Sequence, residues 1–237
     1  MKEKVLGVIG GMGPKATAVF FDRVIEKTEA HKDQEHIDMI ILNHASIPDR
    51  TQSILEHTED EFLREVEKDI QLLEMANVGQ IAIPCNTSHY FYDRMQEMTT
   101  VPIINMVEQT VSQIYELHGE GIKVGLLATN GTISSRVYEK ECNKKGLNLY
   151  IPDEQMQKEV MSIIYDDVKG NQNTDPTRLE GIVKQLIEKE QCQCVILACT
   201  ELSCIPIGEE IAPYCIDAME VLVDRVIERS GKKKINL

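Results

Sequence analysis

The sequence is poor in basic residues and has no long apolar run. Its 25 Lys and Arg stand against 39 Asp and Glu, which gives a formal net charge of −14 at pH 7. Nucleic-acid binding needs a basic surface, so this balance argues against nucleic acid as a partner. Nowhere do about eighteen apolar residues follow one another, so no membrane span is predicted. An acidic protein repels anions at long range, and an acidic substrate would therefore need local cations to hold it.

A secretory signal is also lacking. The apolar run Val5–Ile9 is too short, and too soon followed by glycine, to serve as a signal-peptide core, so we expect the protein in the cytoplasm. A reducing compartment disfavours disulfides, which leaves packing, metal binding or catalysis for the seven cysteines. Cys192-x-Cys194 has no nearby histidine or second cysteine pair to complete a zinc site. Packing is therefore the simpler interpretation, and no metal is expected.

The hydrophobic share of 42% and the charged share of 27% are those of a globular chain. Short apolar runs each precede a longer stretch of helical periodicity, a pattern typical of repeated βα units. The runs predict strands at Val5–Ile9, Met39–Leu42, Gln80–Ile83, Ile103–Ile104, Val124–Leu127 and Val195–Ala198. The stretches predict helices at Pro14–Thr28, Glu59–Asn77, Ser88–Met98, Val107–Leu117, Ser134–Lys144, Gln155–Val168, Pro176–Glu190 and Ala218–Arg229. We expect an α/β protein with mainly parallel sheets.

An internal repeat divides the chain into two similar parts. The run around Gly7 resembles the run around Gly125, and the run that ends at Cys85 resembles the run that ends at Cys199. The members of the two pairs are 118 and 114 residues apart. We therefore expect two similar lobes, each a mainly parallel sheet flanked by helices, formed by residues 1–104 plus 210–237 and by residues 105–209. Ligands in such folds bind at the carboxyl ends of strands, which predicts an active site in the cleft between the lobes.

Each predicted lobe carries a cysteine at the end of a buried strand. In Pro84-Cys85-Asn86-Thr87 the thiol is followed by two residues that often cap helices, which predicts a place at a helix N-terminus, where a thiolate is stabilised. Ala198-Cys199-Thr200-Glu201 repeats the arrangement. One buried cysteine is most simply a packing residue, but the repeated pair favours chemistry. Two opposed thiols suit removal of a proton from one face of a stereocentre and delivery of a proton to the other.

Two further features lie at predicted strand ends. Arg50 follows the second strand, where a guanidinium can grip a carboxylate, although a solvated loop arginine is the simpler interpretation of this residue alone. The glycine-rich turn after the first predicted strand contains Gly11-x-Gly13-x-x-Ala16, which fits a dinucleotide-binding pattern. The acid that an NAD site normally places after the second strand is missing, because Asn43 and His44 stand there. We therefore interpret the glycines as permitting close approach of the backbone to a ligand.

Together these features resemble the aspartate/glutamate racemase superfamily, and within it the aspartate racemase branch. The resemblance runs over nearly the whole chain. It rests on five segments in the family's order, which are residues 7–14, 47–50, 84–87, 125–132 and 198–201. The paired cysteine motifs at this spacing are specific, whereas the glycine motif alone is not.

The resemblance implies two α/β lobes that close over a cleft, a homodimer, and racemisation of a small acidic amino acid, aspartate above all, without pyridoxal phosphate or a metal. It implies that Cys85 and Cys199 are the acid/base pair. It also implies that Arg50 and Lys169 cover the site and hold a side-chain carboxylate. The remaining candidate substrate-binding residues are Met12, Asn86, Thr87, Thr129, Thr200 and Glu201.

Other functions stay open on the sequence. Peptidoglycan-type glutamate racemases usually have histidine after the second Cys-Thr, where this chain has Glu201, so a dedicated glutamate racemase is disfavoured without being excluded. A broad-specificity amino-acid racemase is a further alternative. A related isomerase or decarboxylase would use only one thiol. A non-catalytic amino-acid-binding module would also close two lobes on a ligand, and the glycine pattern leaves an NAD-dependent oxidoreductase as a third class.

Overall fold

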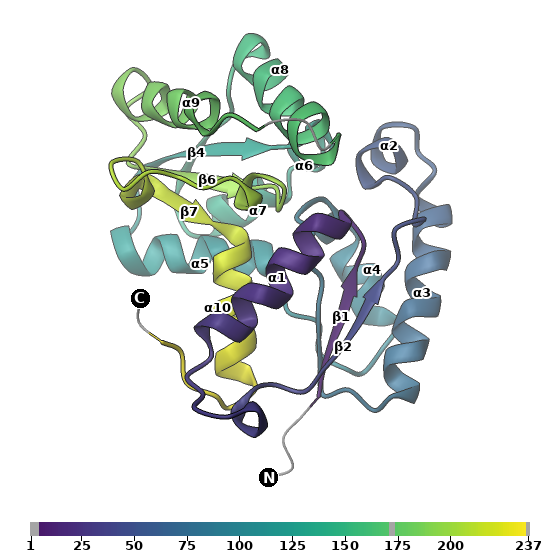
Figure 1. Ribbon diagram of the computed structural model, residues 1–237. Coiled ribbons are helices and arrows are strands. Elements are labelled where there is room, and N and C mark those ends of the chain that lie inside the picture. Colours follow the sequence, from purple (N-terminus) through teal and green to yellow (C-terminus); the bar gives the residue numbers. More distant parts are fainter. Residues whose placement is uncertain (1–4, 171–173, 236–237) are drawn as a thin grey trace.

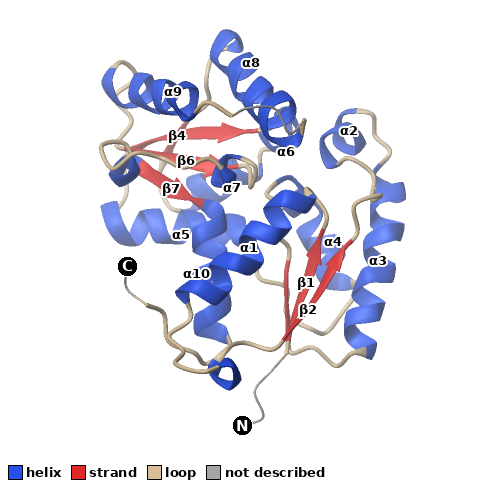
Figure 2. Ribbon diagram, viewed as in Figure 1, coloured by secondary structure: helices blue, strands red, loops and turns tan. Residues whose placement is uncertain are grey.

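The computed structural model describes residues 5–170 and 174–235 (Figure 1). The fold is α/β with two parallel sheets flanked by helices, as the sequence predicted, and we call each sheet with its covering helices a lobe (Figure 2). The first sheet has the order β2-β1-β3, with β2 at Met39–Asn43, β1 at Leu6–Gly10 and β3 at Gln80–Ala82. The second has the order β5-β4-β6-β7, with β5 at Asn148–Tyr150, β4 at Lys123–Ala128, β6 at Cys194–Ala198 and β7 at Cys215–Asp217.

The helices mostly begin where a polar residue caps them. Asp49, Asn105, Asp153, Asp175 and Asp217 each accept a hydrogen bond from a backbone N–H in the first turn of the helix that follows. The α-helices are α1 (Pro14–Lys27), α2 (Arg50–Leu55), α3 (Glu59–Met75), α4 (Tyr92–Glu97), α5 (Met106–His118), α6 (Asn130–Ser135), α7 (Val137–Lys144), α8 (Glu154–Ser162), α9 (Pro176–Glu188) and α10 (Ala218–Arg229). The 3₁₀ turns are η1 (Asp33–Glu35), η2 (Thr87–Phe91), η4 (Leu202–Cys204) and η5 (Ala212–Tyr214), and η3 (Ile163–Lys169) is a π-helix.

The elements stack in layers. Helices α1, α5, α7 and α10 bury their apolar sides in one central core together with the inward faces of both sheets (Figure 1). Helices α3 and α4 cover the outer face of the first sheet, and α8 and α9 cover the outer face of the second. Both faces of each sheet are therefore buried, which explains why the strands are short apolar runs without polar alternation. Among the helices of the described residues, none is long and apolar enough to cross a membrane.

The sequence repeat corresponds to a repeated strand register. Gly7 of β1 pairs with Ile81 of β3, and Gly125 of β4 pairs with Val195 of β6. A methyl group added at Gly7 would lie 2.9 Å from a side-chain carbon of Leu73 in α3, and one added at Gly125 would lie 3.1 Å from a side-chain carbon of Leu186 in α9. In both lobes the glycine thus allows the outer helix to pack tightly on the sheet.

The structure differs from the sequence-based elements at several places. The helix predicted over 134–144 is broken at Arg136, which has φ 55, and the stretch 155–168 is divided between α8 and the π-helical η3. Ile103 forms only an isolated parallel bridge to Ile81. Helix α2 and the three-residue strands β5 and β7 were not predicted. Strand β7 pairs with β6 in the second sheet, although it falls in the range that the sequence assigned to the first lobe.

Candidate active site

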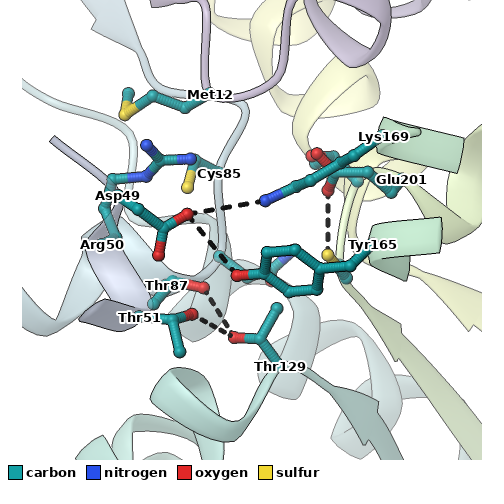
Figure 3. A pocket seen from close by; sticks show the side chains of 13 residues that line it. Met12, Asp49, Arg50, Thr51, Cys85, Thr87, Thr129, Tyr165, Lys169 and Glu201 are labelled. Atoms are coloured by element: carbon teal, nitrogen blue, oxygen red, sulfur yellow. Dashed lines mark hydrogen bonds and ion pairs between the residues drawn. The ribbon is translucent and has the colours of Figure 1, made fainter. Parts of the chain in front are cut away.

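A pocket of about 260 Å³ lies at the carboxyl ends of strands from both sheets (Figure 3). It brings together all ten residues that the sequence singled out, from six separate segments of the chain. Those residues are Met12, Arg50, Cys85, Asn86, Thr87, Thr129, Lys169, Cys199, Thr200 and Glu201. Three lining residues were not among the candidates, and these are Asp49, Thr51 and Tyr165. The segment 47–50 pointed to the neighbourhood of Asp49, but nothing in the sequence pointed to Tyr165.

Cys85 follows β3 in a tight turn that a histidine holds. The thiol is 5% exposed, and the carbonyl of Cys85 accepts a hydrogen bond of 2.7 Å from the Ser88 hydroxyl. The backbone N–H of Met106 donates to Nε2 of His89, so Nδ1 carries the ring proton and donates to the Cys85 carbonyl at 2.9 Å. Burial lowers the pKa of His89 and keeps this ring neutral. His89 therefore ties the cysteine turn to the start of α5.

Asn86 stands at the N-cap of η2, as the pattern predicted, but the expected side-chain capping bond does not form. The Asn86 side chain makes no capping bond to η2, and its Oδ1 instead accepts a hydrogen bond of 2.5 Å from the hydroxyl of Tyr138 in α7. The Thr87 hydroxyl bonds to Thr129 and Thr132 at 3.1 and 2.8 Å. Tertiary partners from the second lobe have thus replaced the local bonds that the sequence pattern suggested.

A guanidinium accompanies the first thiol. Arg50 is 7% exposed, and its Nη1 donates to the Pro48 carbonyl at 3.1 Å. Burial alone would lower the pKa of Arg50, but attraction to the Cys85 sulfur and to the carboxylates of Asp49 and Glu201 outweighs burial and raises it. The positive charge of Arg50 is therefore secure, and it lies beside the sulfur of Cys85.

The second thiol has a carboxylate as its neighbour. Cys199 follows β6, is 6% exposed, and donates a hydrogen bond of 2.9 Å to Oε2 of Glu201 (Figure 3). Burial and the negative charge of Glu201 both raise the pKa of Cys199 well above its ordinary value. Cys199 is therefore a protonated thiol in this arrangement. The two cysteines follow equivalent strands but have neighbours of opposite charge, Arg50 and Glu201.

Threonine hydroxyls join the lobes at one side of the pocket. Thr51 of α2 donates to Thr129 at 3.2 Å, and Thr129 caps α6 by accepting from the N–H of Thr132. Close contact here depends on Gly131, because a methyl group at that position would lie 2.7 Å from the Thr51 Cα. At another side, the Thr200 hydroxyl donates to the Pro84 carbonyl at 3.3 Å, which links the two cysteine segments.

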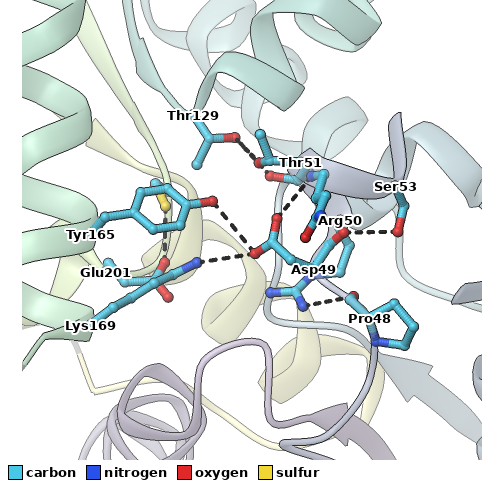
Figure 4. Close-up of polar contacts among 12 residues, drawn as sticks. Pro48, Asp49, Arg50, Thr51, Ser53, Thr129, Tyr165, Lys169 and Glu201 are labelled. Atoms are coloured by element: carbon cyan, nitrogen blue, oxygen red, sulfur yellow. Dashed lines mark hydrogen bonds and ion pairs between the residues drawn. The ribbon is translucent and has the colours of Figure 1, made fainter. Parts of the chain in front are cut away.

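Charged and aromatic side chains span the pocket beside the threonines (Figure 4). Lys169, at the end of η3, lies with Nζ 3.7 Å from Oδ2 of Asp49 and 4.1 Å from the ring centre of Tyr165. The Tyr165 hydroxyl approaches the same Asp49 oxygen at 3.5 Å. Burial alone would lower the pKa of Lys169, but the nearby negative charges, Glu201 first, raise it. A cation thus covers the site from the second lobe, as Arg50 does from the first.

The glycine-rich turn serves the protein's own packing. Gly11 has φ +89, and a methyl group there would lie 2.4 Å from the backbone of His44. The N–H of Gly11 donates to the Thr17 hydroxyl at 2.8 Å, so it is not free for a phosphate. The interpretation that the glycines make room for a ligand is therefore wrong for Gly11, and the dinucleotide-binding pattern has no matching geometry here. Among the glycines of this turn, Gly13 is the one that borders the pocket. A methyl group added at Gly13 would lie 3.0 Å from Oε1 of Glu201.

A family model described as Asp/Glu/Hydantoin racemase matches residues 9–226. The broad specificity amino-acid racemase RacX of Bacillus subtilis is 28% identical to the chain over 205 residues, which cover 85% of this chain and 87% of that protein. Among solved structures, the aspartate racemase of Picrophilus torridus matches with 31% identity and a TM-score of 0.82, covering 98% of this chain and 96% of that one. An aspartate racemase homologue from Pyrococcus horikoshii is 25% identical with a TM-score of 0.77, covering 96% and 99%.

Proposed function

Because the chain belongs to the Asp/Glu/hydantoin racemase family and is therefore an amino-acid racemase, an isomerase, we propose that it interconverts the enantiomers of aspartate with Cys85 and Cys199 as its two bases. One observation carries the proposal. Two thiols that end equivalent strands line a single pocket, one beside a guanidinium and the other donating to a carboxylate.

The first half of the proposed mechanism uses the charge difference between the thiols. Cys85, as a thiolate beside Arg50, removes the α-proton from one face of the substrate, and the electron pair of the C–H bond stays on the substrate. Cys199, as a thiol, then delivers its proton to the opposite face. Cys85 ends as the thiol and Cys199 as the thiolate, so a proton transfer between them, through solvent, restores the starting state.

Conversion of the other enantiomer requires the opposite protonation states of the two thiols. Cys199 must then begin as the thiolate, against the raised pKa that burial and Glu201 give it. The α-proton of an amino acid is feebly acidic, so either thiolate depends on exclusion of water and on donors to the substrate carboxylate. Asn86, Thr87, Thr129 and Thr200 line the pocket as candidate donors, and Met12 contributes an apolar wall.

The choice of substrate rests on the cations of the site. In a chain with a net charge of −14, Arg50 and Lys169 supply the positive charge that a side-chain carboxylate needs. The structural match to an aspartate racemase supports aspartate. The sequence match to a broad specificity racemase makes a wider set of amino acids the second candidate.

Three further features belong to the same proposal. We propose a homodimer, and we propose a division of the chain into residues 1–104 plus 210–237 and residues 105–209, in which α10 packs against α1 of the first unit although β7 pairs with β6 of the second. We also propose a cytoplasmic location, because all seven cysteines are free thiols.

The experiment is racemisation in heavy water, with single L- and D-amino acids as substrates. We expect aspartate to lose its optical rotation and to gain one deuterium at the α-carbon without loss of carbon dioxide. Racemisation of many amino acids at similar rates would favour the broad-specificity alternative. Tight binding of aspartate with no exchange of the α-proton would contradict racemisation and favour a binding module.

A further inference from the structure

Three buried polar atoms of the pocket have no hydrogen-bond partner among the described residues. They are Nε of Arg50, Nδ2 of Asn86 and Oε1 of Glu201. The Asn86 and Glu201 side chains are 2% and 4% exposed. A buried polar group without a partner is costly, so such atoms in a pocket indicate the groups that a ligand brings. Here they comprise two donors and one acceptor.

The orientation of the Asn86 amide is fixed. Its Oδ1 accepts from the Tyr138 hydroxyl, so Nδ2 must be the atom that faces away from Tyr138. The Arg50 and Asn86 donors therefore suit the carboxylate oxygens of a ligand. An α-amino acid also carries an ammonium group, which needs an acceptor.

Glu201 is the carboxylate that is open to such a group. The pocket contains one other carboxylate, Asp49, whose Oδ1 accepts from the N–H of Gln52 and whose Oδ2 faces Tyr165 and Lys169. In contrast, Oε2 of Glu201 accepts from Cys199 and Oε1 accepts from none of the described residues.

We propose that Oε1 of Glu201 receives the ammonium group of the substrate while Oε2 holds the Cys199 thiol. This inference rests on the proposed function and names the part of the substrate that this residue recognises. One carboxylate then joins the ammonium to the thiol that transfers the α-proton. The site should accordingly bind α-amino acids with a free ammonium group more tightly than the corresponding hydroxy acids, whose neutral hydroxyl offers Oε1 a weaker hydrogen bond than a charged ammonium group.

The arrangement couples substrate binding to the state of the thiol. Without a ligand, the negative charge of Glu201 and burial together keep Cys199 protonated. An ammonium group on Oε1 compensates that charge, so Cys199 releases its proton more readily when an amino acid is bound. By linkage, loss of the proton from Cys199 strengthens binding of the ammonium group by the same factor.

The test compares the full chain with Glu201→Gln, and uses Glu210→Gln as a matched control, because Glu210 is an exposed glutamate outside the pocket. The ligand-free proteins are alkylated with iodoacetamide over a range of pH, and each cysteine is followed by mass spectrometry. We expect Glu201→Gln to raise the alkylation rate of Cys199 at pH 8 by about tenfold, which corresponds to one pKa unit. Cys85 in the same sample and Cys199 in Glu210→Gln should not change. An unchanged Cys199 profile in Glu201→Gln would overturn the proposal.

The first arm of a second measurement uses the wild-type protein alone, so it does not depend on a variant that folds. Calorimetry on the wild-type protein compares aspartate with malate, in which a hydroxyl replaces the ammonium group. We expect aspartate to bind about tenfold to a hundredfold more tightly, and Glu201→Gln to lose most of that difference. Equal binding of the two ligands by the wild-type protein would overturn the ammonium site even if aspartate is racemised. Conversely, a Glu201-dependent preference for aspartate without any racemisation would uphold this inference and contradict the proposed function.

Discussion

The hydroxyl of Tyr138 in the second lobe donates a 2.5 Å hydrogen bond to Oδ1 of Asn86 in the first lobe. Tyr138 is 1% exposed, and burial raises its pKa far above the ordinary tyrosine value, so the hydroxyl keeps the proton that it donates to Asn86. The bond fixes which end of the Asn86 amide faces the pocket.

Tyr138→Phe should therefore affect both stability and substrate binding. We expect the free energy of unfolding to fall by about 1–2 kcal/mol, because a buried acceptor loses its donor. We also expect KM to rise more than kcat falls, because the freed amide can turn its oxygen toward the substrate carboxylate. Urea unfolding and steady-state kinetics measure the two effects, with Tyr115→Phe on the exposed side of α5 as the control. A loss of stability with an unchanged KM would contradict the positioning role.

Removal of the guanidinium beside Cys85 should act on one thiol only. In Arg50→Gln, we expect alkylation of Cys85 at neutral pH to slow by about tenfold or more, since a charge-assisted contact of this kind contributes about 1.5–3 kcal/mol. Cys199 should alkylate as before, because its neighbour is Glu201. Equal slowing at both cysteines would show that the effect comes from general disturbance of the pocket.

Any side chain added at Gly131 should disrupt its close contact with Thr51. A methyl group at Gly131 would lie 2.7 Å from the Thr51 Cα, so Gly131→Ala must push α2 and α6 apart. We expect loss of activity and a lower midpoint of thermal unfolding. Gly181 in α9 is the matched control, because nothing lies within 4 Å of an added methyl group there. Gly181→Ala should raise the free energy of unfolding by about 0.5–1 kcal/mol.

Buried and half-buried thiols away from the pocket should make the protein less stable at alkaline pH. Burial raises the pKa of Cys142, Cys194 and Cys215 from 9.0 to about 12. Between these values the folded protein keeps the thiol protons and the unfolded chain releases them, so the stability contribution is complete below pH 9 and is lost as pH rises. Each thiol contributes a slope of at most about 1.4 kcal/mol per pH unit. Urea unfolding of the wild-type protein and of Cys142→Ala from pH 8 to 11 should show a shallower decline in the variant, and parallel curves would contradict it.

The sequence predicted the fold and the place of the thiols because both depend on local patterns. Apolar runs that end at Cys85 and Cys199 sit in equivalent registers, so the repeat in the sequence became a repeat in the sheets. Strands β5 and β7 were missed because each has only three residues, and their pairing depends on neighbours distant in sequence.

The polar partners inside the site were less predictable. Asn86 accepts a hydrogen bond from a tyrosine 52 positions away, and Asp49 of the first lobe faces Tyr165 of the second. No local spacing in the sequence predicts either pair. The capping bonds expected from the side chains of Asn86 and Thr87 do not form, because these side chains make tertiary hydrogen bonds with Tyr138 and Thr129 instead. Lys169 was predicted through family resemblance, and its place at the end of a π-helical turn follows no simple periodicity.

The two-thiol mechanism is tested most directly by following the α-hydrogen of each enantiomer of aspartate in heavy water with Cys85→Ala and Cys199→Ala. With one base removed, inversion should stop in both variants. The remaining thiol should still exchange the α-hydrogen of one enantiomer with solvent, and the two variants should act on opposite enantiomers. Racemisation of both enantiomers at the wild-type rate by either variant would contradict the mechanism.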